Sequence, residues 1–157
     1  PIYLDPWSSW LENSGSLLAF PYGYSMWITF LPLAFLSKVL GIPLEYGYEV
    51  TLLMCDFALL YVLSRMLPGR HRLVLFTYWL SPVVILASFG LGLNDVIPAL
   101  YLMTAILFLN RQQLKLTGVF FALAISAKLS MRVVLPFLIL YIQALELTKL
   151  LPTIFIK

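Results

Sequence analysis

Long apolar segments, each near the thickness of a bilayer and separated by short polar turns, make up most of this chain. They constrain the fold strongly, because hydrocarbon offers the backbone no hydrogen-bond partners and each segment must satisfy its own as a helix. The sequence is 62% hydrophobic and 11% charged, whereas soluble domains average about 45–50% apolar and about 25% charged residues. The sequence therefore predicts an all-α fold, a polytopic transmembrane helix bundle.

The chain divides into an aromatic N-terminal stretch and a series of apolar segments. We expect residues 1–23 to form an external or interfacial loop, because Trp and Tyr with scattered polar groups suit the headgroup layer. Residues 24–157 are expected to form about five or six membrane helices. The whole of 1–157 then reads as a single transmembrane domain, the N-terminal part of a larger protein. The expected segments are 24–40, interrupted at Pro32; 48–67; 73–91, kinked at Pro82; 96–109; 114–127; and 133–147.

Basic residues gather in two connecting loops, and this distribution predicts orientation. Arg65, Arg70 and Arg72 follow one segment, and Arg111 and Lys115 lie in another turn. Short basic loops belong to the cytoplasm, which puts the turn at 88–95 on the opposite face. With so few charges outside these loops, we expect no nucleic-acid partner.

The segment over 24–40 conflicts with this orientation if it spans the membrane. Both it and the next segment would then cross, and the aromatic residues 1–23 would be cytoplasmic, which their composition does not favour. We therefore expect a re-entrant or interfacial helix pair broken at Pro32, with a full span as the alternative.

Four polar residues lie inside stretches that are otherwise apolar: Asp56, Asn94, Asp95 and Lys128. Ionisable groups at membrane depth cost roughly 2.5–3.5 kcal/mol each, so they usually face a cavity or a partner. Asn94 or Asp95 could cap the helix that follows, with Pro98 in its first turn, or the helix N-terminus could hold a phosphate. Asp56 is expected to pair with a basic residue elsewhere in the bundle.

Two further sites carry open alternatives. Lys128 and Arg132, four residues apart, either snorkel to the interface or form an anion site for a lipid phosphate. Asp5, followed by Pro6 and Trp7, is either an ordinary loop residue or a general base for a sugar hydroxyl.

The order of several short motifs resembles one family. The Asp5 loop precedes Phe-Pro-Tyr-Gly at 20–23, and Leu-Ser-Pro-Val-Val-Ile-Leu-Ala-Ser-Phe-Gly-Leu-Gly-Leu-Asn-Asp follows at 80–95. Thr-Gly-Val-Phe-Phe-Ala-Leu-Ala-Ile-Ser-Ala-Lys-Leu at 117–129 and Leu-Pro-Phe at 135–137 come later. This order is similar to that of the polytopic GT-C glycosyltransferases, particularly the mannosyltransferase-like members that use polyprenyl-phosphate sugars.

The resemblance implies a GT-C-like fold and a set of roles. Asp5 would be the catalytic carboxylate, Asn94 and Asp95 would line the active site, and Lys128 with Arg132 would bind the donor phosphate. The partners would be a polyprenyl-phosphate sugar donor, a lipid-linked or extracytoplasmic acceptor and membrane lipids. The location would be multi-pass in a bacterial plasma membrane or the ER membrane. No ligand spacing demands a metal, although Asp5 and Asp95 could share a divalent ion.

The residues leave two other classes of function open. In a transporter or flippase component, Pro32, Pro82 and Pro98 would mark broken helices, and Asp56 and Lys128 would be coupling charges. The third class is a non-catalytic polytopic membrane subunit.

Overall fold

The computed structural model describes residues 23–86 and 94–143, and all elements in these two stretches are helical. The expectation of an all-α fold is therefore confirmed for the described residues. The elements are α2 (Tyr24–Leu40), α3 (Leu44–Met66), α4 (His71–Val74), the π-helix η2 (Leu75–Trp79), α5 (Pro82–Ile85), α6 (Val96–Asn110), α7 (Leu114–Ala127) and the 3-10 helix η4 (Leu129–Val134), from which an apolar helix continues to Gln143.

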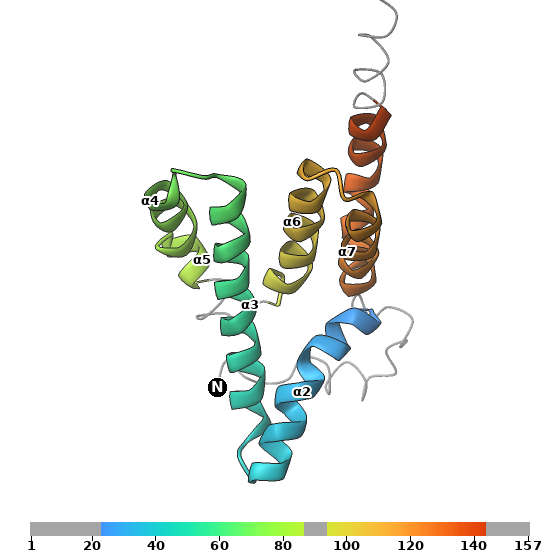
Figure 1. Ribbon diagram of the computed structural model, residues 1–157. Coiled ribbons are helices and arrows are strands. Elements are labelled where there is room, and N and C mark those ends of the chain that lie inside the picture. Colours follow the sequence, from blue (N-terminus) through green and yellow to red (C-terminus); the bar gives the residue numbers. More distant parts are fainter. Residues whose placement is uncertain (1–22, 87–93, 144–157) are drawn as a thin grey trace, which may run out of the picture.

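Two helical hairpins form the frame of the molecule. One joins α2 to α3, and the other joins α6 to α7. Figure 1 shows α2 beside the first half of α3 and α6 beside its second half. α2 also contacts α7, so the two hairpins pack against each other rather than lying in a row.

The core lies where α2, α3, α6 and the end of α7 meet. Its buried members are Met26, Leu52, Cys55, Leu59, Val96, Ile97 and Ala127. Two side-chain contacts extend this core along the helices. The hydroxyls of Thr29 and Tyr101 are 2.7 Å apart and join α2 to α6, while the rings of Phe30 and Tyr48 stack with centroids 4.7 Å apart.

The expected break at Pro32 is wrong, because α2 continues through this residue as one helix of 17 residues. Pro32 removes one hydrogen bond, but tight packing on α3 holds the helix on both sides of it. A Cβ added to Gly47 of α3 would lie 2.9 Å from the carbonyl oxygen of Leu33, so the two helices meet there backbone to backbone. α2 ends at Gly41, whose φ of 65° is left-handed and suits glycine.

The segment that precedes the 88–95 turn is broken more sharply than the predicted kink. In place of one helix over 73–91, it forms α4, η2 and then α5, with Ser81 extended at ψ 124°. A residue that precedes proline is pushed out of the helical region, and Pro82 is suited to the first position of a new helix. Residues 87–93 lie outside the described part of the chain.

The other predicted segments agree with the structure more closely. α7 has the expected bounds, and α6 extends one residue beyond the expected 96–109. α3 begins four residues before the expected start at residue 48 and ends one residue before residue 67.

Within the described residues, one helix is both long and apolar enough to cross a membrane. It is α3, with 23 residues and a mean hydropathy of 1.4 in its best window. At 1.5 Å per residue it is about 34 Å long, against a hydrocarbon thickness of about 30 Å. The remaining apolar helices have 10–17 residues. Of the five or six membrane helices expected, the described residues thus support one, α3, as a full span.

Candidate functional site

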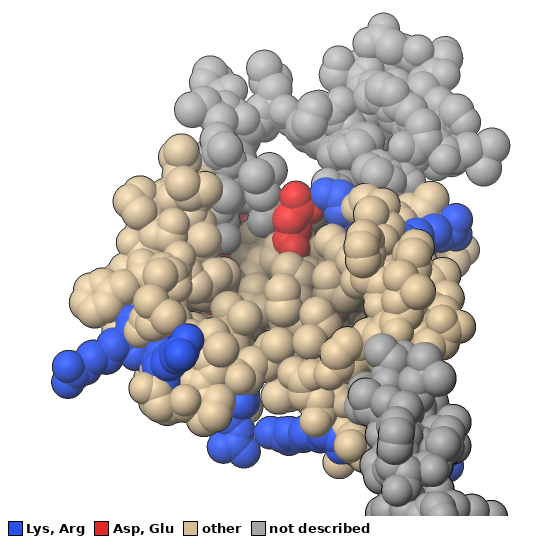
Figure 2. All heavy atoms as spheres, turned by 90° about the horizontal axis from the view of Figure 1, so that it is seen from above, with Lys and Arg blue, Asp and Glu red and all other residues tan. Residues whose placement is uncertain are grey.

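Two of the predicted site residues meet in an ion pair. The Nζ atom of Lys128 donates a hydrogen bond to Oδ1 of Asp95, although the two residues are 33 positions apart. Asp95 directly precedes α6 and Lys128 directly follows α7. The antiparallel packing of these helices therefore brings the beginning of one to the end of the other. Figure 2, seen from above, shows acidic atoms directly against basic atoms.

Both side chains of the pair are accessible, with 26% of Lys128 and 54% of Asp95 exposed. Lys128 leaves the helical conformation, with φ −146° and ψ 120°, as the chain turns from α7 into η4. This extended residue sets its side chain outside the regular surface of either helix. The arrangement provides a cation and a carboxylate that a ligand can reach.

The beginning of α2 packs directly against the same end of α7. The Gly23 N–H donates to the carbonyl oxygen of Ala127 at 3.2 Å. Ser25 Oγ donates to the carbonyl oxygen of Leu123 at 2.7 Å, and Ser25 N–H lies 3.4 Å from Ser126 Oγ. The Phe-Pro-Tyr-Gly motif thus ends beside Lys128, and three helix ends converge at this place.

Gly23 is required at this contact, which gives a first prediction. A Cβ there would lie 1.9 Å from the carbonyl oxygen of Ser126, and a backbone atom cannot rotate away. We expect Gly23→Ala to destabilise the protein by about 1–3 kcal/mol, as overpacking generally does. The measurement is the thermal unfolding midpoint of the purified full-length protein.

Gly118 is the matched control for this substitution. It lies inside α7 with no neighbour within 4 Å of an added Cβ. Gly118→Ala should leave stability unchanged or raise it by up to about 1 kcal/mol through helix propensity. Equal effects of the two substitutions would contradict the close approach of α2 to α7.

The ion pair is level with the middle of α3. Figure 1 shows α6 beginning beside the central turns of α3, and the core cluster joins Val96 and Ile97 to Leu52 and Cys55. The middle of a 23-residue helix lies roughly 17 Å from either end. The charges therefore lie well away from both ends of the longest apolar helix.

The predicted capping role of Asp95 is wrong for its side chain, which makes no cap hydrogen bond to α6. Its carboxylate contacts Lys128 instead, because the ammonium is a stronger donor than a helix N–H. Pro98 lies in the first turn of α6 as expected, and it is fully buried.

The other predicted site residues lie at different distances from the pair. Asn94 is adjacent to Asp95, and its carbonyl oxygen accepts from the Ile97 N–H at 3.2 Å. Arg132 is exposed on η4. Of the two predicted phosphate-binding residues, Lys128 is the one that pairs with Asp95. Asp5 lies outside the described residues.

Asp56 has a partner other than the one expected. It is fully buried in α3, and its Oδ1 accepts a hydrogen bond from the hydroxyl of Tyr78 in η2 rather than from a basic side chain. Its Oδ2, like Trp79 Nε1, is buried and has no hydrogen-bond partner among the described residues. The rings of Phe57 and Trp79 pack with centroids 4.8 Å apart. This polar contact attaches η2 to α3.

Within residues 23–86 and 94–143, no group of three or more His, Cys, Asp or Glu side chains is arranged to hold a metal ion. The charged groups that converge in the described part are one ammonium and one carboxylate. This arrangement suits the binding of an anion that competes with the carboxylate better than the binding of a cation.

Sequence reasoning missed three residues around the site. The sequence predicts only the end of the N-terminal loop at Gly23 and a helix that includes Ser25, yet both residues fix α2 against α7. Tyr78 was one aromatic among many in an apolar segment, and its partnership with Asp56 has no sequence signal. For Gly23, one signal was available in the sequence. A residue without a side chain directly before a predicted helix can indicate close packing.

Comparison with protein-family models, curated proteins and solved structures finds no match to this chain.

Proposed function

We propose that this chain forms part of a polytopic membrane glycosyltransferase of the GT-C type. It transfers a hexosyl group, with mannose as the first candidate, from a polyprenyl-phosphate donor to a lipid-linked or extracytoplasmic acceptor. The observation that carries the proposal is the accessible Asp95–Lys128 pair beside the middle of α3.

The depth of this pair supports a polar cavity. With α3 as a membrane span, the pair lies roughly midway through the hydrocarbon layer. A half-exposed carboxylate at that depth cannot face lipid, because charged groups inside membranes face water-filled or protein-lined space. A hydrophilic chamber reached from the membrane is what an enzyme acting on lipid-linked sugars requires.

The apolar surface supports a membrane setting for the remaining helices. Large hydrophobic side chains that are at least 58% exposed include Tyr24, Trp27, Ile28, Leu31, Phe35, Val39, Leu40, Leu44, Tyr46, Met54, Tyr61, Phe76, Val83, Leu86, Val133, Phe137 and Leu140. Soluble monomers rarely gather exposed hydrophobic side chains into large patches, so this many exposed large hydrophobic side chains favour a lipid or protein covering. Helices shorter than the bilayer are accommodated at a modest cost by tilting neighbours and local thinning.

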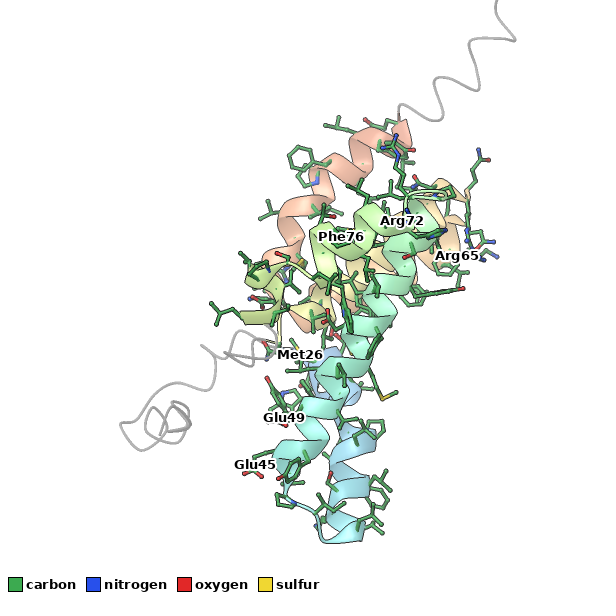
Figure 3. All side chains as sticks on the ribbon, turned by 90° about the vertical axis from the view of Figure 1, so that its left-hand side faces the viewer. Met26, Glu45, Glu49, Arg65, Arg72 and Phe76 are labelled. Carbon is green, nitrogen blue, oxygen red and sulfur yellow. The ribbon has the colours of Figure 1, made fainter. Side chains whose placement is uncertain are left out.

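The distribution of charge supports the expected orientation. Figure 3 shows Glu45 and Glu49 at one end of α3 and Arg65 and Arg72 near its other end. Short basic loops are typical of the cytoplasmic side. We propose that a polyprenyl-phosphate donor, which presents its sugar on the extracytoplasmic side, reaches the Asp95–Lys128 pair from that half of the membrane.

In the proposed mechanism, a carboxylate removes the proton of an acceptor hydroxyl. The hydroxyl oxygen attacks the anomeric carbon as the bond from that carbon to the phosphate oxygen breaks. Asp5 is the candidate base, on the chain that enters the described structure at Gly23, beside Lys128. Lys128 stabilises the phosphate, whose negative charge grows as it leaves.

The test is sugar transfer by the full-length protein in proteoliposomes. We expect transfer from a labelled polyprenyl-phosphate hexose and none from the nucleotide sugar. Asp5→Ala should reduce transfer about 10²–10⁴-fold, the usual contribution of a general base. Glu12→Ala, in the same N-terminal stretch, is the control and should retain activity.

Two results would contradict this proposal. One is transfer unaffected by Asp5→Ala, which removes the assigned base. The other is the absence of transfer together with proton-coupled flux abolished by Asp56→Asn, which would favour the transporter class.

A further inference from the structure

The Lys128 ammonium already has an anionic partner, so an incoming phosphate has to compete for it. That partner is Asp95, with more than half of its side chain exposed. An exposed carboxylate loses little packing when it moves away, and exposed ion pairs are generally weak. The pair is therefore suited to exchange one anion for another.

Three successive residues in the first turn of α6 offer an anion no free N–H group. The Ile97 N–H is used by the carbonyl oxygen of Asn94, and Pro98 has no N–H. The Ala99 N–H donates to the carbonyl oxygen of Asp95 at 3.2 Å. A phosphate bound at this place would therefore be held mainly by the Lys128 ammonium. The same ammonium holds the Asp95 carboxylate.

The two lipid phosphates of the proposed reaction differ in charge. The donor is a phosphodiester with one negative charge, while the product is a phosphomonoester with about −1.5 to −2 charges at neutral pH. A cation that stabilises the leaving phosphate consequently holds the product more tightly than the donor. Without a competing anion, Lys128 would retain the product and slow the next turnover.

On the basis of the proposed function, we propose that Asp95 is an internal counter-ion that displaces the product lipid phosphate from Lys128. The carboxylate moves aside when the donor binds and returns to the ammonium as the monoester leaves. Asp95 then speeds product release and lowers the affinity for lipid phosphates, and it takes no part in breaking the glycosidic bond.

The experiment measures the binding of dodecyl phosphate and its methyl diester to the full-length protein in nanodiscs. We expect Asp95→Asn to tighten monoester binding about two- to fivefold, the range of an exposed ion pair, and to tighten diester binding less. The multiple-turnover rate should fall through product inhibition, and it should fall by a larger factor than the single-turnover rate. Glu49→Gln, an acid-to-amide change on α3, is the control and should alter none of these values.

Weaker or unchanged monoester binding in Asp95→Asn would overturn the counter-ion role while leaving the donor site intact. Asp95→Ala, without an amide, should show the same tightening if the charge is the cause. Dodecyl phosphate binding unaffected by Lys128→Met would instead overturn the phosphate site of the proposed function. Inorganic phosphate should not compete at equal concentration, and equal competition would overturn a lipid-linked ligand.

Discussion

Replacing Lys128 with methionine is expected to reduce sugar transfer about 10²–10³-fold, the loss typical of removing one preorganised charge from a developing anion. The substitution keeps an unbranched apolar stem and removes the ammonium that contacts Asp95. The reduction should appear in single-turnover rate as well as in steady state, because the charge acts on the chemical step. Lys128→Arg should retain part of the rate, since it keeps the charge but changes the geometry of its donors.

Lys38→Met is the matched control for this experiment. Lys38 lies in the last turn of α2, at the end of the helix opposite to the contact with α7. The same chemical change there should leave transfer unaltered. A comparable loss in both variants would mean that the effect comes from net charge or membrane insertion, and full activity in Lys128→Met would remove the assigned phosphate site.

The helices were predicted well where the local pattern decides their ends. α7 begins and ends where polar residues interrupt its apolar run, and Asp95 with Pro98 marks the beginning of α6. Proline was interpreted less well. Pro32 remains inside a continuous helix because α2 packs closely against α3 at the next residue, Leu33, whereas Pro82 starts a new helix. Tertiary packing decides between these outcomes, and one sequence does not contain it.

The sequence predicted which residues belong to the candidate site better than it predicted which of them contact each other. Asp95 and Lys128 were selected because polar residues are costly in apolar segments, and the structure brings them together. The ion pair itself depends on the antiparallel packing of α6 against α7, which residue spacing does not determine. The partner of Asp56 was missed for a similar reason, because tyrosine carries no charge that would mark it as a counterpart.

Replacing Tyr78 with phenylalanine is expected to lower stability by about 2–3 kcal/mol, a large effect for the loss of one oxygen atom. Asp56 is completely buried, and Tyr78 provides the hydrogen bond to its Oδ1, while Oδ2 has no partner in residues 23–86 and 94–143. Without the hydroxyl, both carboxyl oxygens would be buried unpaired, which costs more than the hydrogen bond itself contributes. The measurement is the thermal midpoint of the full-length protein in detergent.

Tyr61→Phe on α3 is the control, because Tyr61 is 62% exposed and its hydroxyl is not needed in the core. The decisive variant is the double substitution Asp56→Val with Tyr78→Phe. Since it removes donor and acceptor together, it should be more stable than Tyr78→Phe alone, as replacing both partners by apolar groups is close to neutral. If the double variant is instead less stable by the sum of the two single effects, the two side chains act independently. In that case η2 is attached to α3 by apolar packing, to which the Phe57–Trp79 contact contributes.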